Sequence, residues 1–475
     1  MEPILLFAIA IITIYITHWV YSWRNPKCNG KLPPGSMGIP LLGETLQFFS
    51  PFTSNDFSPF IKHRMERYGS IFRTSLVGRP VVVSTDQEFN NFIFQQEGKL
   101  FEFWYMDTFT EVMWNKKSVP SLQGYIHKYI RSLILNLTGP QNLKEKLLSE
   151  MDQATMKQLQ SWSTQHANVD LKEAVATMVL NLVSKKLISY DEEKCSKKLR
   201  ESFADIMGSL ISFPLKIPGT PYYNGLQGRK KAITLIRNIL YQRRTSPPKH
   251  HGDFLDLMLE EMKKDNTILT EDLIVSLIFA LIFAFYETIS VSITLTMKFL
   301  TDHPSVVEEL TKEHEMILQK RENKNSRITW EEYKSMTFTT MVINESLRLG
   351  NPIPLILRKT MADVHINGYT IPAGWAVMIC PPVTHLDPTK FADPLTFNPW
   401  RWKGTESNPG KNFMVFGGGA RFCVGAEFAK LQITIFLHHL VTKYRWKVIK
   451  GGDILREPNV KFPNGFQVQF LEKHK

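Results

Sequence analysis

The sequence is poor in cysteine and lacks paired cysteine motifs. Only four cysteines occur among its 475 residues, at Cys28, Cys195, Cys380 and Cys423, and none forms a C-x-x-C pair. This spacing argues against both a disulfide framework and a structural zinc site, and it fits a reducing compartment. One of the four, Cys423, nevertheless lies in an unusually glycine-rich stretch, FMVFGGGARFCVG at 413–425.

The sequence also lacks a concentrated basic element, although its formal net charge is +12. Lysines and arginines are spread along the chain instead of being massed on one element with interleaved aromatics, as nucleic-acid binding would require. We therefore expect no nucleic-acid partner. A positive charge of this size favours an anionic membrane surface or an acidic protein partner.

A long hydrophobic run lies at the N-terminus. Residues 4–23 contain no Lys, Arg, Asp or Glu, and a helix of that length spans roughly 30 Å, the thickness of a hydrocarbon core. Basic residues follow the run and a single glutamate precedes it, so the positive-inside rule places the remainder in the cytosol. A cleaved signal peptide is the alternative, but a basic leader and a convincing cleavage site are missing. We expect a transmembrane anchor at 4–23 and a stiff, proline-rich hinge at 24–45.

The remaining chain, 46–475, shows no internal repeat and no break in composition, which predicts one large domain. Helical periodicity dominates from 122 to about 349. Its strongest segment, 270–300, begins with a threonine N-cap and is apolar on all sides, so we expect a helix of about 45 Å through the centre. Strand signals are fewer: a β-branched run at 79–85 and a hairpin turn at 367–368. The predicted fold class is mostly α with a smaller β region.

The stretch around Cys423 could serve several chemistries. A phosphate-binding loop requires Gly-Lys-Ser/Thr, which is absent, and a dinucleotide fingerprint requires a glycine where Phe422 stands. A catalytic thiol requires a histidine partner, whose position the sequence does not reveal. The motif that matches is F-x-x-G-x-R-x-C-x-G, formed by Phe416, Gly419, Arg421, Cys423 and Gly425. On these residues the chain resembles the cytochrome P-450 superfamily of haem-thiolate monooxygenases.

The resemblance implies a haem b cofactor with Cys423 as the axial ligand of the iron. A cysteine just before a helix N-terminus is favoured as the thiolate, and thiolate ligation promotes O–O cleavage. Arg421 and Arg358 resemble the two propionate-binding arginines of the family. The segment HKYIR resembles the helix whose tryptophan and arginine also hold propionate. Arg131 retains that arginine, whereas His127 replaces the tryptophan and is either a propionate donor or a surface histidine.

Further matches follow in the order that the family requires. Glu345 and Arg348 in ESLR, with Arg401 in FNPWRW, resemble the Glu-Arg-Arg network that stabilises the fold. His385 in THLDP resembles a common family position, for which we expect a structural role. The aromatic run LFEFWYMDTF at 100–109 predicts either a substrate pocket or core packing.

The long helix contains AFYET, which resembles the family's (A/G)-G-x-(D/E)-T motif. Burying a carboxylate is costly without a purpose, and the resemblance implies that Glu287 and Thr288 deliver protons for oxygen activation. A hydrogen bond between helices is the alternative role. Phe285 stands where the family has glycine, so its ring must either point into a neighbouring helix or intrude over the substrate.

The resemblance extends from the hinge to the C-terminus and implies a single large haem domain anchored in the endoplasmic reticulum, facing the cytosol. Electrons would come from NADPH through a separate flavoprotein reductase, whose acidic docking face suits the positive charge. The stretches LPPGSMGIPLLGET, WEEYKSMTFT and FNPWRW resemble the plant clan that oxidises sterols, brassinosteroids and triterpenoids. Within it, the chain is most similar to the branch with sterol side-chain-cleaving enzymes of cardiac-glycoside pathways.

The specific prediction is therefore repeated side-chain oxidation of cholesterol or phytosterols to pregnenolone. Hydroxylation of a triterpenoid or brassinosteroid precursor is the alternative. A haem-thiolate isomerase of hydroperoxides would need no reductase, but such plant relatives typically lack the helix threonine and carry an insertion before the cysteine. This chain has Thr288 and no insertion. A non-catalytic haem carrier or sensor is a further alternative, disfavoured by the retained Glu287–Thr288 pair.

Overall fold

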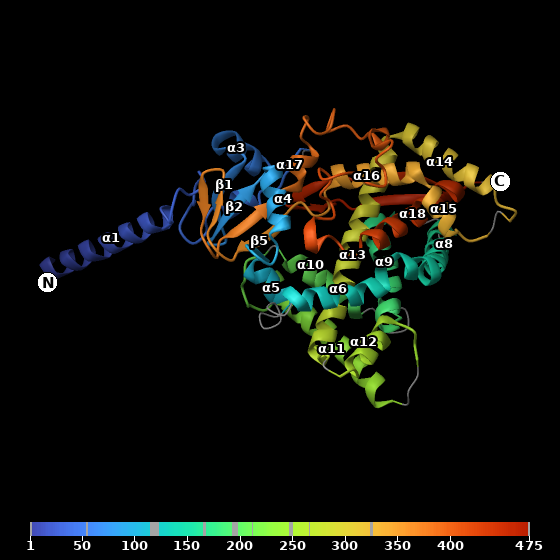
Figure 1. Ribbon diagram of the computed structural model, residues 1–475, viewed down its shortest axis with the longest axis horizontal. Helices are drawn as coiled ribbons and strands as arrows, with labels where there is room; N and C mark the ends of the chain where they lie inside the picture. The colour runs from blue at the N-terminus through green and yellow to red at the C-terminus, as the bar shows by residue number, and fades with distance from the viewer. Residues whose placement is uncertain are drawn as a thin grey trace.

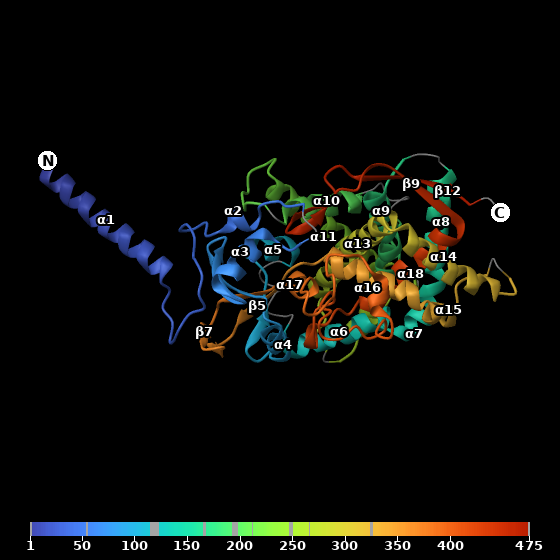
Figure 2. The ribbon, with the colours of Figure 1, turned by 90° about the horizontal axis from the view of Figure 1, so that it is seen from above.

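The computed structural model describes residues 2–53, 56–114, 123–164, 168–191, 198–210, 212–246, 250–265, 267–323 and 326–473. Helices form most of the body. The strands at 71–84 and 356–360 lie near the end from which the N-terminal helix projects (Figure 1), whereas the strands at 444–451 and 466–472 lie at the opposite end, near the C-terminus (Figure 2). The predicted fold class, mostly α with a smaller β region, is confirmed.

The helices have the following bounds: α1 Glu2–Arg24, α2 Thr45–Phe48, α3 Pro59–Tyr68, α4 Gln87–Gln95, α5 Asp107–Met113, α6 Gly124–Thr138, α7 Pro140–Asn142, α8 Leu148–Thr164, α9 Leu171–Ile188, α10 Lys198–Ser209, α11 Pro221–Thr245, α12 Phe254–Met262, α13 Glu271–Asp302, α14 Pro304–Gln319, α15 Trp330–Ser335, α16 Thr337–Gly350, α17 Pro381–His385 and α18 Ala426–Lys443. Short π or 3-10 turns cover Leu143–Leu147, Pro399–Trp402 and Gly419–Arg421.

The strands are β1 Ile71–Leu76, β2 Arg79–Ser84, β3 Phe101–Phe103, β4 Val169–Asp170, β5 Ile356–Thr360, β6 Val364–Ile366, β7 Tyr369–Ile371, β8 Ala376–Ile379, β9 Tyr444–Gly451, β10 Leu455–Glu457, β11 Asn459–Lys461 and β12 Phe466–Glu472. The largest sheet has the order β1-β2-β8-β5-β3. Its strands pair antiparallel except β2 and β8, which are parallel. The predicted hairpin is confirmed, because β6 and β7 pair around Asn367 and Gly368, whose φ angles are 48° and 75°.

Helix α1 stands away from the body, as both ribbon views show (Figures 1 and 2). By length and composition, two helices of the described residues could cross a membrane, α1 and α13. None of the apolar window of α1 is buried, whereas 72% of the corresponding window of α13 is. The two helices therefore have different environments: α13 belongs to the protein core, and α1 exposes its apolar surface.

The segment after α1 is not helical and lies along the sheet. The Arg73 backbone N–H donates to the Pro34 carbonyl at 2.8 Å, and the Thr370 N–H donates to the Lys31 carbonyl at 2.7 Å. The proline-rich stretch is thus attached to β1 and to the start of β7 by backbone hydrogen bonds.

Helix α13 runs through the middle of the helical part (Figure 2). The Thr270 hydroxyl accepts from the Leu273 N–H at 3.2 Å, which confirms the predicted N-cap. Its 32 residues extend about 48 Å at the usual rise. It packs against α9, α11, α16 and α18, so its residues can reach both the cysteine loop and the opposite side of the molecule.

Candidate functional site

The cysteine loop, residues 413–425, leads into the N-terminus of α18. The Cys423 N–H donates to the Phe416 carbonyl at 2.9 Å, which closes the loop on itself. Gly425 is the residue before the helix, and its backbone N–H donates to the Cys423 sulfur. The loop therefore presents the sulfur beside a helix N-terminus, as the sequence predicts.

Two glycines of this loop, Gly418 and Gly419, are needed because the loop packs closely against Phe94, and not because of the sulfur. Gly419 has a φ of +62°, and a Cβ there would lie 2.2 Å from the Phe94 carbonyl oxygen. A Cβ on Gly418 would lie 2.6 Å from the Phe94 ring. Only glycine lets the loop approach the end of α4 this closely.

The Cys423 side chain is exposed to a cavity of about 460 Å³ inside the protein. The cavity brings together most of the residues singled out from the sequence. Three guanidinium groups, one imidazole, the sulfur and one face of α13 line it: Arg131, Arg358, Arg421, His127, Cys423, Ala284, Phe285 and Thr288. Apolar residues such as Val415, Ile289 and Ile433 form further parts of the wall.

The electrostatics of this cavity follow from burial and from the arginines. Burial raises the pKa of the Cys423 thiol, while the Gly425 N–H and the charge of Arg131 act in the opposite direction. Burial, followed by the charges of Arg421 and Arg131, lowers the pKa of His127 to about 4. His127 is therefore neutral at physiological pH and half-buried in the cavity wall, not a surface histidine.

This donor set matches what a haem requires. A porphyrin needs apolar surfaces on its faces, cations for its two propionates and an axial ligand for its iron. The cavity offers apolar walls, three guanidinium groups and one sulfur. A metal ion also deprotonates a thiol that coordinates it, so the raised pKa of the Cys423 thiol is compatible with this use.

Sequence reasoning missed Glu97, which follows α4. Its carboxylate accepts from the Arg421 Nε at 2.7 Å and from the Arg358 Nε. No local motif marks this glutamate, since its partners lie far along the chain. A glutamate after an amphipathic helix is ordinarily solvated, so nothing in the sequence around Glu97 indicates a role in the site.

A second pocket, of about 410 Å³, adjoins the first. The two share Phe103, Tyr105, Ala284 and Thr288 among their lining residues. The aromatic run at 100–109 contributes both to a pocket and to the core. Its Phe101 is fully buried in the core, whereas Phe103, Tyr105 and Phe109 line the pocket.

Glu287 and Thr288 lie where this pocket meets the helix. The Thr288 hydroxyl donates to the Ala284 carbonyl at 2.6 Å. The Glu287 carboxylate forms an ion pair with Lys172 of α9, with Oε2 and Nζ 3.4 Å apart. Both side chains line the 410 Å³ pocket, and Thr288 also faces the cysteine cavity. Lys172 was not anticipated from the sequence.

Phe285 takes the first of its two predicted orientations. Its ring packs against Phe428 of α18, with 4.6 Å between ring centroids, and it is 6% exposed. A Cβ on Gly425 would lie 3.3 Å from the same ring. Phe285 lines the cysteine cavity but is not among the lining residues of the second pocket.

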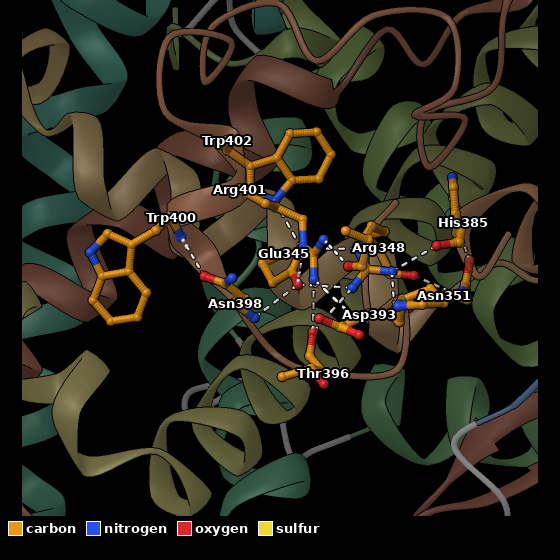
Figure 3. A network of polar contacts seen from close by, with 12 residues as sticks. Glu345, Arg348, Asn351, His385, Asp393, Thr396, Asn398, Trp400, Arg401 and Trp402 are labelled. Atoms are coloured by element: carbon orange, nitrogen blue, oxygen red, sulfur yellow. Dashed lines mark hydrogen bonds and ion pairs between the residues drawn. The ribbon is translucent and has the colours of Figure 1, made fainter. Parts of the chain in front are cut away.

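The Glu-Arg-Arg residues meet in one network (Figure 3). Glu345 and Arg348 are fully buried and form two hydrogen bonds of 2.8 and 2.9 Å. The Arg401 Nε donates to the same carboxylate at 2.9 Å. The Trp402 indole N–H and the Asn398 backbone N–H also donate to the Glu345 carboxylate, at 2.9 and 3.0 Å. The Glu345 carboxylate thus accepts five hydrogen bonds, two of them from residues not singled out in the sequence.

His385 connects this network to the cysteine loop. The Arg348 Nη1 donates to the carbonyls of His385 and Pro394, both at 2.7 Å. The Met414 N–H donates to the His385 Nε2 at 2.9 Å, so Nδ1 carries the proton and donates to Asn351 Oδ1 at 2.6 Å. Burial, followed by the charge of Arg348, lowers the pKa of His385 to about 3. A neutral, fully buried histidine with two partners has a structural role.

Comparison with known proteins agrees with these features. The sequence profile of the family "Cytochrome P450" matches residues 33–470. Cytochrome P450 87A3 of Oryza sativa subsp. japonica is 50% identical over 96% of this chain and 89% of its own. The beta-amyrin 16-alpha-hydroxylase of Maesa lanceolata is 44% identical over 99% of both chains. The cucurbitadienol 11-hydroxylase of Siraitia grosvenorii is 44% identical over the whole of both.

A sterol enzyme and a solved structure are also similar. The cholesterol 22-monohydroxylase of Paris polyphylla is 36% identical over 98% of both chains. The structure of the retinoic acid-bound cyanobacterial CYP120A1 superposes with a TM-score of 0.81 at 26% identity, covering 94% of this chain and all of the other. The chain therefore belongs to the cytochrome P450 family of monooxygenases, which use thiolate-ligated haem b and receive electrons from a redox partner.

Proposed function

We propose that Cys423 is the thiolate ligand of the haem iron and that Arg131, Arg358 and Arg421 hold the propionates, with His127 as a neutral donor. The observation that carries this assignment is their convergence on one 460 Å³ cavity. Haem bound there supplies the oxygen-activating chemistry. The protein supplies the apolar walls, the cationic end and the ligand.

Thr288 and Glu287 have the positions expected of a proton path. Thr288 lines both cavities, and Glu287 is 16% exposed, within the second pocket. Thr288 would hold a proton at its Oγ1 beside the cysteine cavity, and Glu287 would exchange protons with water in the pocket. Lys172 fixes the position of the glutamate from α9.

The substrate that we propose is a sterol or triterpenoid. The 410 Å³ pocket is within the usual size range of ligand pockets. It is lined mainly by aromatic, methionine and aliphatic side chains, and Glu287 is the one acidic side chain among the described residues that line it. Such a wall suits a rigid hydrocarbon skeleton with few oxygens. The named relatives at 44% and 36% identity act on triterpenoids and on cholesterol, which supports the same class.

Within this class the finer proposal is repeated side-chain oxidation of cholesterol or a phytosterol, with C–C cleavage to pregnenolone. It rests on the resemblance to the sterol side-chain-cleaving branch. Ring hydroxylation of a triterpenoid is the second candidate, favoured by the two relatives at 44% identity. A hydroperoxide isomerase or a haem carrier is disfavoured by the retained Glu287–Thr288 pair.

The test is product analysis in yeast membranes that contain the protein and a plant NADPH-cytochrome P450 reductase. Cholesterol, sitosterol, β-amyrin and cucurbitadienol are supplied separately, and products are identified by mass spectrometry. Pregnenolone from the sterols supports the finer proposal, and hydroxylated triterpenoids support the second. A fatty-acid hydroperoxide is supplied as a further substrate: its conversion without NADPH would indicate an isomerase, while neither product nor NADPH consumption with any of the substrates would indicate a carrier. Thr288→Ala is the matched variant, which should consume NADPH but form less product.

The same proposal includes the endoplasmic reticulum membrane, with an anchor at 4–23, a connecting segment at 24–45 and a catalytic domain, 46–475, on the cytosolic side. The exposed apolar surface of α1 supports it. A second membrane contact is proposed at 211–219, the loop before α11. Phe213, Leu215 and Ile217 in it are each more than half exposed, and its first residue, Ile211, lies outside the described residues. Deleting residues 1–23 should release the body partly into the soluble fraction, whereas complete retention at high salt would show that the loop dominates.

A further inference from the structure

We propose that Glu97 is a positioning residue for the haem propionates: it holds Arg358 and Arg421 side by side and brings the charge of the propionate end of the cavity to match two carboxylates. The inference rests on the proposed haem-holding role of these two arginines. It concerns a residue that belongs to no sequence motif discussed above.

The contacts place Glu97 between the two arginines. One carboxylate oxygen accepts from the Arg421 Nε at 2.7 Å, and the other accepts from the Arg358 Nε. All three side chains are largely buried: Glu97 is 7% exposed, Arg358 6% and Arg421 13%. Glu97 itself is not among the residues that line the cavity. The carboxylate therefore lies behind the arginines, while the guanidinium groups face the cavity.

The donors left on Arg358 point to a ligand in the cavity. Its Nε is used by Glu97 and its Nη1 donates to the Leu357 carbonyl at 2.8 Å. Within the residues that the structure describes, Nη2 has no acceptor. Two anchored nitrogens orient the planar group, and the third remains for an anion. A guanidinium has this fork geometry, whereas a lysine would offer a single point charge.

The charges then balance. The cavity is lined by three guanidinium cations, Arg131, Arg358 and Arg421, and by the neutral His127. Adding the Glu97 carboxylate behind them changes three positive charges to a net two. Haem carries two propionates, so this end of the cavity becomes neutral when it is filled. Without Glu97, one buried cation would lack a counter-charge, which is costly in a site of low dielectric.

The backbone around Glu97 makes this arrangement rigid. The Gln96 carbonyl accepts from the N–H groups of Lys99, Leu100 and Phe101, which forms a tight turn after α4. Strand β3 then pairs with β5, where Phe103 lies opposite Arg358. The same end of α4 packs on the cysteine loop through Phe94. One short segment therefore positions Arg358 on β5 and Arg421 in the loop relative to each other.

The experiment compares Glu97→Gln and Glu97→Ala with the parent in the full-length, haem-loaded protein. Haem loss is followed by transfer to apomyoglobin, and the midpoint potential of the iron is titrated under the same conditions. We expect roughly tenfold faster haem loss in Glu97→Ala, because a charge-assisted bridge is lost, and a smaller effect in Glu97→Gln, which keeps one acceptor. Both variants should shift the potential to more positive values, because a negative charge near the iron is removed.

Glu102→Gln is the matched control, since Glu102 lies on β3 but pairs with Lys359 at 3.4 Å and not with the cavity arginines. The Glu102→Gln variant should change neither measurement.

Should Glu97→Ala yield no haem protein, Glu97→Asp is used in its place, because the shorter side chain cannot span both arginines. Its potential should stay close to the parent's while its haem loss increases. Parent-like haem loss and potential in all Glu97 variants would overturn the inference.

Arg358→Gln and Arg421→Gln separate this inference from the function on which it rests. If both accelerate haem loss and the Glu97 variants do not, the arginines hold the propionates without help from Glu97, and only the inference fails. If neither accelerates haem loss, the proposed propionate role itself is wrong. In the Arg358→Gln background, Glu97→Gln should add less than it does alone, because one of the two bridges is already absent.

Discussion

Glu287 of the central helix α13 is paired with Lys172 of α9, with the two charged atoms 3.4 Å apart. The lysine also lies 3.9 Å from Glu173, which in turn contacts Arg200 at 3.3 Å. The acid beside Thr288 therefore belongs to a short chain of charges that leads from the pocket towards the surface of α9. This relationship gives Glu287 a fixed position without removing it from the pocket.

If Glu287 transfers protons, Glu287→Gln should lower product formation roughly 100-fold, the usual scale of general acid–base catalysis, with haem content unchanged. Lys172→Met should have a smaller effect and should raise the fraction of NADPH that ends as peroxide, because the carboxylate loses its partner. In the Glu287→Gln background, Lys172→Met should add almost nothing. NADPH use, peroxide and product are measured together, with Glu271→Gln as the control, because Glu271 lies at the exposed start of the same helix and pairs with Arg244. Additive effects would show that the lysine acts independently of Glu287.

Cys423→Ser should remove the red-shifted Soret band of the reduced, CO-bound protein. Serine has the size of cysteine but supplies no thiolate, and the band depends on that ligand. Cys28→Ser is the control, because Cys28 is half-buried, its thiol donates to the Thr370 carbonyl at 3.6 Å, and it is not among the residues that line the cavity. Difference spectra of both variants decide the matter, and a persistent band in Cys423→Ser would assign the ligand to another residue.

Glu345→Gln should destabilise the fold strongly. Arg348 is fully buried, and its charge is balanced within the network by this carboxylate. Breaking one partner of a buried ion pair costs about 3–5 kcal/mol. Arg401→Lys should cost less, since the carboxylate keeps its bonds to Arg348 and Trp402. Thermal unfolding of the haem-bound forms measures both, and equal melting temperatures for parent and Glu345→Gln would contradict the assigned role.

The local part of this network could be predicted from the sequence, and the rest could not. Glu345 and Arg348 are three residues apart on one helix, so their contact follows from helix geometry. The same holds for the Thr270 cap, the hairpin at Asn367 and the position of Cys423 just before α18, which are all set by residues close in sequence. Each of these signals lies within a short window of sequence.

The long-range contacts had no such signal. Glu97 reaches Arg421, and Lys172 reaches Glu287, only because the chain folds back on itself. Charged residues are usually solvated, so composition alone favours the surface for Glu97 and Lys172. The orientation of Phe285 was likewise open, because it depends on the space beside α18. These positions required the tertiary structure.

A buried histidine cluster predicts sensitivity to acid. His314 lies 3.0 Å from His438 between ring nitrogens and 3.0 Å from the Thr339 hydroxyl. Burial, followed by the charges of His439 and Arg321, lowers the pKa of His314 to about 3. In the unfolded chain a histidine titrates near 6.5. Above about pH 6.5, His314 is neutral in both states and its protonation does not oppose folding. As the pH falls from 6.5 towards 3, the unfolded chain binds a proton at His314 before the folded protein does, so the free energy of unfolding decreases.

The measurement is proton uptake on urea unfolding at pH 5. There an unfolded histidine is protonated and a folded one with a pKa of about 3 is not, so His314 accounts for about one proton. His314→Phe should reduce the uptake by about one, whatever its effect on overall stability. Uptake equal to that of the parent would show that His314 is already protonated in the folded protein.

The orientation of Phe285, which the sequence leaves open between two alternatives, is towards the neighbouring helix α18. A phenylalanine over the substrate would have acted as a selector, and removing it would have admitted new orientations. The ring instead packs on Phe428 and beside Gly425, so it supports the start of α18 just after Cys423. Phe283, two residues earlier, is the one that lines the 410 Å³ pocket. The two aromatic residues of α13 therefore line different cavities: Phe283 the 410 Å³ pocket and Phe285 the cysteine cavity.

Phe285→Ala should consequently leave the product distribution unchanged while lowering stability by roughly 3–5 kcal/mol, as for other buried aromatic truncations. Phe285→Gly should cost about 1 kcal/mol more, because glycine is unfavourable inside a helix. Both should also loosen the haem, since Phe285 lines the cysteine cavity next to Gly425, whose N–H donates to the sulfur. Phe283→Ala is the matched control and should alter the products with a smaller loss of haem. Mass spectrometry of the products and haem content after purification distinguish the two, and new oxidation positions in Phe285→Ala at full haem content would restore the selector role.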